Sequence, residues 1–518
     1  MRNLSSLLLL FATLTLGSSA FGATYQVGPG KTYSNLGAVT GILNPGDIVE
    51  VDGDQTYPGG VVFDRPGTAA QKITIRGIRI NGKRPALTGG NNTIEAAANH
   101  YVFEGLDLSG GTSRCFYHHA NNIVLRDSVV HDCPKQGILG ADNDSGSLLL
   151  EYTEVHHCGG GTFDHQIYMA TNEVDYPGSV FRMQHCYVHD ANGGNSVKSR
   201  AERNEIYYNW IEGAMYHELE LIGPDPAGGV SENTAREDSD VVGNVLRKRN
   251  TFAVVRFGGD GTGQSNGRYR FVNNTVITLG GGSAVFRLFH GLESVEAHNN
   301  VFFSIGGFVN MVREVEADWS TGQTLFAGSN NWAINGTTNI PADWSGTILG
   351  DNPGFLNIDA NDLHIDMQSP LVDAGANATS GPPGHDFPQP LDKPLWHPPS
   401  HTVEASGAAL SRPSSGAIDI GAYEFNAGGA GGAGGSSSSS SSSGNGGAGG
   451  GGNGGGGGGA GGGGDGGSGE GGFGASGNEP VASSSCGCRT IGDPTGNVAW
   501  ALSLLSLAAF ASRRRRGS

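Results

Sequence analysis

The chain has 518 residues, with 31 Lys and Arg against 49 Asp and Glu, so its formal net charge at pH 7 is −18. Binding to nucleic-acid phosphates needs a basic surface, so this charge argues against a nucleic-acid partner. Any other anionic ligand must find a local group of positive side chains.

The N-terminus has the three parts of a secretory signal peptide. Arg2 is followed by an apolar run over residues 7–16 and by small residues at 17–20. The run is shorter than the roughly 20 apolar residues that span a bilayer, so a cleaved signal over residues 1–23 is favoured over a permanent membrane anchor. We therefore expect the protein to be exported.

Residues 24–425 carry a repeat of short β-rich segments, each with a small or amide residue followed two places later by an apolar one. The period is roughly 25 to 30 residues, which is one lap of three short strands, sometimes with an inserted loop. The pattern lacks the helical segments between strands that an α/β protein needs. It predicts an all-β fold, a parallel β-helix of about ten or more coils whose strands stack about 4.8 Å apart. The repeat anchors are Gly77, Gly105, Ser128, Thr153, Cys186, Asn209, Asn244, Asn274, Asn300 and Asn331.

Two features refine this solenoid. The last anchors are all asparagine, from Asn209 to Asn331, which predicts an internal ladder of side-chain amides bonded from coil to coil. Residues 34–43 form the one convincing helical stretch, and we expect it to be an N-terminal cap on the open end of the first coil.

The two ends of this region resemble a known family. GPGKTYSNLGAV at 28–39 with NPGDIVEVDGDQTYPGG at 44–60 resembles the start of secreted β-helix proteins with a pectate-lyase-like fold. DNPGFLNIDANDLHIDMQSPLVDAGA at 351–376 with DIGAYEF at 419–425 resembles their closing segment. The resemblance implies a right-handed parallel β-helix over residues 24–425, but no single activity, because this fold serves many functions.

Histidines and cysteines recur at fixed offsets in the early coils. His131, His156 and His189 form one stack, which we interpret as filler on a sheet face, with a transition-metal site as the alternative. Cys133 and Cys158 also share an offset. In an exported chain we expect a disulfide between them, with stacked thiols as the alternative.

The second strands of five successive coils align as HQIYMA, NSVKSR, HELELI, AVVRFG and AVFRLF. Side chains alternate between the two faces of a strand, so one residue of each segment points into the core and the next residue points outward. The outward residues of successive coils then lie in one line. The inward set is Ile167, Val197, Leu219, Val255 and Phe286. The outward set is Tyr168, Lys198, Glu220, Arg256 and Arg287. Cations on so acidic a chain make this line a candidate groove for an acidic polysaccharide. The alternative is a solvated face on which opposite charges pair.

Removing the proton beside a uronate carboxyl needs a base that can be neutral and a cation that neutralises the carboxylate. Lys198, if flanked by Arg256 and Arg200, has its charged form disfavoured and suits the first role. Arg256 stays charged and suits the second. We expect the substrate to be bound by Tyr168, Arg200, His217, Glu220 and Arg287.

The segment SVKSRAERNEIYYN at 196–209 resembles the lysine-containing strand of the chondroitinase B and alginate lyase family. The resemblance implies that Lys198 is the Brønsted base. The arginine that this family carries one coil later would fall near Glu220, so Arg256, a further coil on, is the nearest substitute.

Lyases of this kind often use calcium to neutralise the uronate. Glu218 and Glu220, with Asn192 and Asn195, offer hard oxygen ligands for Ca²⁺ from neighbouring coils. Simple ion pairs between the two glutamates and the nearby basic side chains are the alternative.

These patterns predict a polysaccharide lyase that acts on a uronate-containing polysaccharide by β-elimination. A non-catalytic glycan-binding or adhesive surface protein is the alternative, and in either case we expect a monomer. A cleft beside Lys198, formed by the inserts between Leu221 and Asp240 and between Gly258 and Arg268, would favour the enzyme. An open face would favour the binder.

Beyond the repeat region the composition changes abruptly. Residues 426–482 are mostly Gly, Ser and Ala, which cannot form a core and predict a disordered linker. In the tail, residues 483–518, two cysteines precede an apolar segment at 498–511 and an arginine run at 513–516. This order resembles the C-terminal sorting signals called MYXO-CTERM, which implies that sorting machinery attaches a secreted protein to the outer cell envelope. A short tail anchor is the alternative.

Overall fold

The computed structural model describes residues 22–425, apart from residues 142, 224–235, 260–264, 281–282, 290, 315–324, 392 and 414–415. The predicted linker, the predicted tail and nearly all of the predicted signal peptide lie outside these residues. The central parts of the two inserts that we expected to form a cleft, 224–235 and 260–264, lie outside them too. Within the described ranges, no helix is both long enough and apolar enough to cross a membrane.

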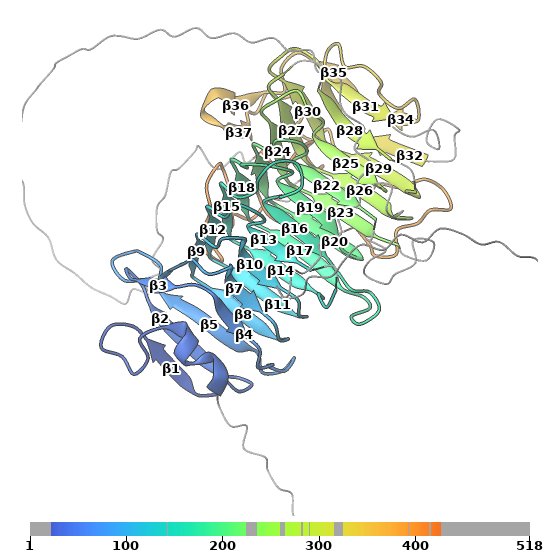
Figure 1. Cartoon of the computed structure of the whole chain (residues 1–518). Helices are drawn as coiled ribbons and strands as arrows, with labels where there is room; N and C mark the ends of the chain where they lie inside the picture. The colour runs from blue at the N-terminus through green and yellow to red at the C-terminus, as the bar shows by residue number, and fades with distance from the viewer. Residues whose placement is uncertain are drawn as a thin grey trace, which may run out of the picture. The chain divides into compact units, whose positions relative to one another are not determined.

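Three long parallel sheets form a right-handed β-helix, and over residues 48–314 each coil contributes one strand to each sheet in the order A, B, C (Figure 1). Sheet A contains β1 (Thr24–Val27), β2 (Ile48–Asp52), β5 (Ile73–Ile78), β8 (Tyr101–Glu104), β11 (Ile123–Arg126), β14 (Leu148–Glu151), β17 (Val180–Gln184), β20 (Arg203–Tyr207), β23 (Asp238–Val242), β26 (Arg268–Val272), β29 (Ser294–His298), β32 (Leu325–Ser329) and β34 (Trp344–Ser345). Sheet B contains β3 (Thr56–Pro58), β6 (Ala86–Thr88), β9 (Asp107–Ser109), β12 (Val129–His131), β15 (Glu154–His156), β18 (Tyr187–His189), β21 (Trp210–Glu212), β24 (Val245–Lys248), β27 (Thr275–Thr278), β30 (Val301–Ser304), β33 (Trp332–Ile334) and β35 (Ile348–Gly350).

Sheet C, which carries the predicted site, contains β4 (Val61–Phe63), β7 (Asn92–Ala96), β10 (Arg114–His118), β13 (Ile138–Gly140), β16 (Ile167–Ala170), β19 (Val197–Arg200), β22 (Leu219–Ile222), β25 (Val255–Gly258), β28 (Ala284–Leu288) and β31 (Asn310–Glu314). A separate antiparallel pair, β36 (Phe355–Asn357) and β37 (Asp362–Ile365), follows the last coil, with the 3-10 helix η4 (Ile358–Ala360) between them. The predicted fold class is confirmed.

The N-terminal cap differs from the predicted helix. Residues 34–43 form two short 3-10 helices, η1 (Leu36–Ala38) and η2 (Thr40–Ile42), in place of one α-helix. Two glycines in this stretch weaken α-helix formation. Its apolar side chains still reach the core, where Leu36, Val39 and Leu43 are fully buried.

The asparagine ladder is confirmed at the turn between sheets A and B. Asn209 Nδ2 donates to Asn244 Oδ1 (2.9 Å), and Asn244 Nδ2 donates to Asn274 Oδ1 (3.0 Å). Asn300 and Asn331 continue the chain of bonds. Each amide also bonds to backbone groups, so polar groups inside the solenoid are satisfied along its axis.

The residue before each ladder position makes the sharp turn. Tyr208 has φ 56° and Asn273 has φ 53°, in the left-handed region. Gly105, which we assigned as a repeat anchor, has φ 72° and occupies this turn position as well. The buried position of its coil is therefore Leu106, whose N–H donates to Ser128 Oγ (3.2 Å).

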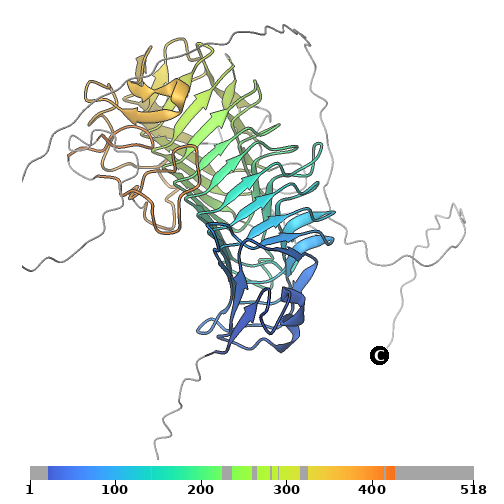
Figure 2. The ribbon, with the colours of Figure 1, turned by 90° about the vertical axis from the view of Figure 1, so that its left-hand side faces the viewer.

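The segment after the last coils, residues 366–425, turns back along the solenoid and is called the return segment here (Figure 2). Its DIGAYEF end lies against sheet B, where Ala422 and Tyr423 pack with Trp210 and Val245. Gly421 N also donates to Asn299 O (2.8 Å). The predicted closing segment thus covers a side of the coils.

Replacing Asn244 by Ala should lower the free energy of unfolding by roughly 2 kcal/mol, because two donors of buried Asn209 lose their acceptor. Urea unfolding of the full chain followed by circular dichroism measures this. Asn335→Ala is the matched control, since exposed Asn335 bonds only at the surface, to Asp351 (2.7 Å). Equal unfolding midpoints for the two variants would contradict a stabilising ladder.

Candidate active site on sheet C

The predicted outward line exists on sheet C. The strand register pairs Tyr168 with Lys198, Lys198 with Glu220, and Glu220 with Arg256. Arg256 pairs in turn with Arg287, while the five predicted inward residues are fully buried. We call this outward line the sheet C row.

The row is longer than the sequence alignment suggested. Arg287 pairs with Arg313 of β31, which places a third arginine one coil further on. In the other direction Tyr168 pairs with Leu139, and Leu139 with Tyr117. Arg313 was missed although its segment, NMVRE, has an arginine directly after a valine, as AVVRFG does at Arg256.

Glu220 lies between the two proposed catalytic cations. Its carboxylate is 2.6 Å from Arg256 Nη1 and 3.9 Å from Lys198 Nζ, and it accepts a hydrogen bond from Asn195 Nδ2. Although burial opposes the shift, Lys198 and Arg256 hold the pKa of Glu220 well below its usual range. Lys198 is therefore separated from Arg256 in the row by β22 and its carboxylate, so Glu220 and not Arg256 is its neighbour on the next coil.

Lys198 and Glu220 are nearly enclosed. Their side chains are only 9% and 4% exposed, and Lys198 Nζ lies 5.3 Å from the ring centre of Tyr168. A charged pair in such surroundings is screened less by solvent than a surface pair. The alternative prediction was a solvated face on which opposite charges pair. The charges of Lys198 and Glu220 do pair, but their side chains have little contact with solvent.

Two neutral histidines complete the surroundings of Glu220. Asn195 Oδ1 accepts from His217 N (2.8 Å) and lies 3.2 Å from His217 Nδ1, while His165 Nδ1 accepts from Asn195 N (3.0 Å). Burial lowers the pKa of His165 to about 3 and holds that of His217 well below its ordinary value. The rings of His165 and His217 therefore form hydrogen bonds in their uncharged state. His165 was not among the predicted site residues.

Aromatic rings lie beside the arginines of the row. The Arg256 guanidinium is 3.8 Å from the ring centre of Phe289, and the Arg287 guanidinium is 5.1 Å from the same ring. Arg287 also lies 5.6 Å from the Phe252 ring centre. Neither phenylalanine was predicted. Phe252 lies just before an aligned segment, and Phe289 ends the segment AVFRLF, whose alignment does not indicate which side chains its ring contacts.

The remaining predicted residues lie deeper. Arg200 is buried and donates from Nη1 to Gly223 O (2.6 Å). Glu218 is also buried and pairs with Lys248 Nζ (3.4 Å), and burial raises the pKa of Glu218. Glu218 bonds to Ser196 and Lys248, whereas Glu220 bonds to Asn195 and Arg256, so in the described part of the chain the two carboxylates do not form one calcium site.

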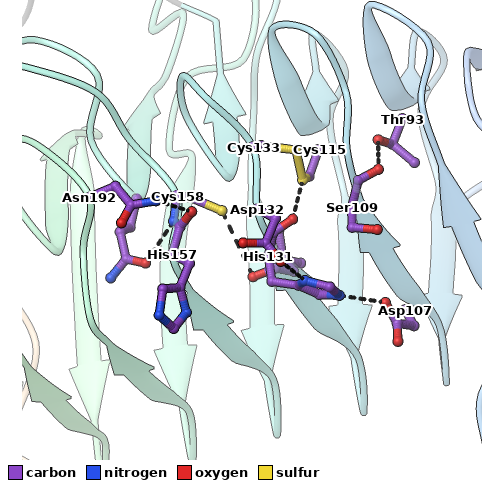
Figure 3. Close-up of a disulfide and its surroundings, with 12 residues drawn as sticks. Thr93, Asp107, Ser109, Cys115, His131, Asp132, Cys133, His157, Cys158 and Asn192 are labelled. Atoms are coloured by element: carbon purple, nitrogen blue, oxygen red, sulfur yellow. Dashed lines mark hydrogen bonds and ion pairs between the residues drawn. A yellow bond between two sulfur atoms is a disulfide. The ribbon is translucent and has the colours of Figure 1, made fainter.

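The histidine stack is present on sheet B. The ring centres of His131 and His156 are 5.1 Å apart, and those of His156 and His189 are 5.0 Å apart. Both ring nitrogens of His131 bond to carboxylates, of Asp107 (2.9 Å) and Asp132 (2.7 Å) (Figure 3). Among the described residues, no three His, Cys, Asp or Glu side chains could hold a metal ion. The stack is thus held by carboxylates.

Protonation alternates along this stack. A hydrogen bond to Asp107 raises the pKa of His131 to about 9, whereas burial lowers the pKa of His156 to about 4. Although burial opposes it, bonds to Glu154 and Asp190 raise the pKa of His189. The hydrogen bonds thus favour the charged forms of His131 and His189, whereas burial favours the neutral form of His156 between them.

The predicted disulfide between Cys133 and Cys158 is wrong. Cys133 bonds to Cys115, and Cys158 is a free, buried thiol (Figure 3). Cys115 and Cys133 are 18 residues apart, nearly one lap, with Cα atoms 5.7 Å apart, in the usual range for a disulfide. The shared repeat position of Cys133 and Cys158 correctly placed them on adjacent coils. It could not show that Cys133 bonds to Cys115 instead of Cys158.

Comparisons with known proteins support the fold. No family model and no curated protein matches the chain. The structure of pectate lyase Pel9A is similar, with a TM-score of 0.52 and 12% identity over 79% of this chain and 97% of that one. An alginate lyase from Paenibacillus sp. str. FPU-7 has a TM-score of 0.34 and 14% identity, covering 56% of this chain and 94% of that chain. The PL6 family alginate lyase AlyGC has a TM-score of 0.35 and 13% identity, covering 61% and 48%. The chain therefore has a pectate-lyase-like β-helix, and similarity at this level of identity shows the fold alone.

The His131 pairing should make stability depend on pH. Because its pKa rises from 6.5 to about 9 on folding, its contribution is complete below pH 6.5 and is lost as the pH rises through 9. Thermal unfolding midpoints of the wild type and His131→Gln should therefore differ most below pH 6.5 and converge near pH 9. His364→Gln, which removes a histidine paired with Asp362, is the control. A constant difference across this range would contradict the assignment.

Proposed function

We propose that this protein is a polysaccharide lyase-type enzyme that cleaves a uronate-containing polysaccharide by β-elimination. Lys198 is the base and Arg256 neutralises the carboxylate of the reacting sugar. The observation that carries the proposal is the sheet C row, which presents both cations from one face, with Glu220 bonded between them.

The chemistry needs a proton acceptor and a fixed positive charge. In the elimination, the base takes the proton on the carbon beside the carboxyl group. A carbon–carbon double bond forms while the bond to the leaving oxygen breaks. A guanidinium stays charged at every physiological pH, and Arg256 is fixed by Glu220, by Gly259 O (3.1 Å) and by the ring of Phe289. A cation held in place before the substrate arrives stabilises developing charge with little reorganisation.

Lys198 must be neutral when it acts. Its ammonium group pairs with Glu220, while its side chain retains little contact with water. A sugar bound over the row would remove the remaining water, and desolvation favours the neutral amine. Tyr168, whose ring lies beside Lys198 Nζ, would contact the same sugar.

Charge also supports an acidic substrate. The whole chain carries a net charge of −18, so a polyanion is repelled except where cations are concentrated. The row places Lys198, Arg256, Arg287 and Arg313 on four of five successive coils.

A non-catalytic glycan-binding protein is the second candidate. It is favoured by the pairing of Glu220 with both proposed catalytic cations, which resembles a stable structural cluster. The same cations would then hold a polyanion without removing a proton.

The metal proposal has weaker support. Glu218 is paired with Lys248 and Glu220 with Arg256, so these residues do not fit a calcium ion in this arrangement. No step of the proposed mechanism depends on calcium.

We also propose export and attachment to the cell envelope, which rests on the sequences at residues 1–23 and 483–518. The linker at residues 426–482 would let the folded body reach polysaccharide near the cell surface.

Replacing Lys198 by Ala should lower the rate of product formation by about 10² to 10⁴-fold, because the general base is missing. The measurement is ultraviolet absorbance of unsaturated ends after incubation with polygalacturonate, alginate or chondroitin sulfate, with and without calcium. Lys83→Ala is the matched control, because Lys83 pairs with Asp54 far from the row and its side chain is 71% exposed. Wild-type rates from Lys198→Ala would exclude this base, and binding without product by the wild type would favour the second candidate.

A further inference from the structure

We propose that Asn195 is a positioning residue of the candidate active site. Its side-chain amide holds Glu220 toward Arg256 and keeps His217 in one neutral tautomer, whose Nε2 atom accepts a hydrogen bond from a hydroxyl group of the bound uronate. The inference rests on the proposed function, because it assigns a further contact to the ligand of the same site.

Asn195 lies between two histidines in a stack at the turn from sheet B to sheet C. His165, Asn195 and His217 hold the same position before β16, β19 and β22, which are neighbours in sheet C. Asn195 N–H donates to His165 Nδ1 (3.0 Å), and His217 N–H donates to Asn195 Oδ1 (2.8 Å). All three side chains are buried. The stack thus resembles the asparagine ladder, but only its central member is an amide.

The amide of Asn195 has one orientation that satisfies its neighbours. Its Nδ2 group donates to Glu220 Oε2, and an ionised carboxylate only accepts hydrogen bonds. Its Oδ1 atom then faces His217, where it accepts the backbone N–H. A rotated amide would place donors against that N–H, so both ends of the side chain select the same orientation.

This orientation fixes the tautomer of His217. Its Nδ1 atom lies 3.2 Å from Asn195 Oδ1, which has no proton, so Nδ1 carries the proton and donates the hydrogen bond. Burial holds the pKa of His217 well below its ordinary value, so the ring stays neutral and Nε2 keeps its lone pair. His165 has the opposite tautomer, because its Nδ1 accepts from Asn195 N–H.

His217 Nε2 is buried and has no hydrogen-bond partner among the described residues. Nearly all buried polar atoms have a partner, so this atom points to a donor that the folded chain does not supply. The ring is close enough to Arg256 to be affected by its charge, and it packs edge-to-face against partly exposed Phe252, with ring centres 4.9 Å apart. When Phe252 rotates, a hydroxyl beside the carboxylate held by Arg256 can reach Nε2.

Glu220 depends on the same amide. The bond from Asn195 Nδ2 occupies Oε2, the oxygen that lies 3.9 Å from Lys198 Nζ, while Oε1 binds Arg256 Nη1 (2.6 Å). Without this bond the carboxylate can turn toward Lys198, and Arg256 then loses its fixed acceptor. Asn195 therefore acts on both cations through Glu220.

The first test is the tautomer of His217 in the full chain with ¹⁵N-labelled histidine, read from the ring nitrogen resonances at neutral pH. The wild type should show a proton on Nδ1 of His217 and on Nε2 of His165. Asn195→Leu should lose the His217 tautomer, whereas Asn195→Asp, which keeps the acceptor, should keep Nδ1 protonated. Asn192→Leu is the matched control, because exposed Asn192 in the same loop bonds only to His157 O (2.7 Å).

The second test adds oligogalacturonate, oligoalginate or a chondroitin sulfate oligosaccharide at low temperature, where turnover is slow. The oligomer that binds should move the His217 Nε2 resonance and leave His165 Nδ1 in place. His217→Asn, which keeps a polar group near Nδ1 but none at Nε2, should weaken its binding about tenfold in calorimetry. Asn195→Asp should lower kcat about tenfold to hundredfold, because the groups that carry out the reaction are misplaced.

The proposal is wrong if wild-type His217 carries its proton on Nε2, a result that needs no variant to fold. It is also wrong if Asn195→Leu leaves the tautomer unchanged. If no oligomer moves the Nε2 resonance, a bound water is the donor and the assignment to a sugar is overturned. A wild type that forms no product would refute lyase activity, while the spectra would still decide the role of Asn195.

Discussion

Backbone hydrogen bonds between successive coils are the interaction on which the rest of the structure depends. They fix which residue of one coil lies above which residue of the next, in parallel register along three sheets. A slip of one residue would exchange the buried and outward faces of a strand. Glu220 and Arg256, 36 residues apart, form an ion pair only because this register holds.

Stacking equal side chains has different consequences for different groups. Amides both donate and accept, so Asn209 and its counterparts stabilise one another along the axis. Imidazoles can stack because protonation alternates between charged His131 and neutral His156. Guanidinium groups have neither option, since they are always charged and only donate. A guanidinium group must therefore be held by acceptors or by rings, as Arg256 is by Glu220, Gly259 O and Phe289.

The sequence period was sufficient to predict the parallel β-helix, the asparagine ladder and the outward line from Tyr168 to Arg287. All three depend only on lap length and on side-chain alternation. Contacts between groups in the same region could not be predicted, because they depend on side-chain direction. The bond from Cys133 to Cys115, the hydrogen bond from Asn195 to Glu220, and the rings beside Arg256 belong to this class.

The arginines on sheet A are held in place by carboxylates and by an aromatic ring. Arg203 bonds to Glu205 and Asp240, Arg268 bonds to Asp238, and Arg270 bonds to Asp240, so Arg203 and Arg270 share one carboxylate. Phe387 of the return segment then packs against all three guanidinium groups. On sheet C, Lys198 and Arg256 likewise share the carboxylate of Glu220, and Phe289 lies beside Arg256. The two faces therefore fix guanidinium groups in the same way, by a shared carboxylate and an aromatic ring, which holds the charge of Arg256 in one position before any ligand binds.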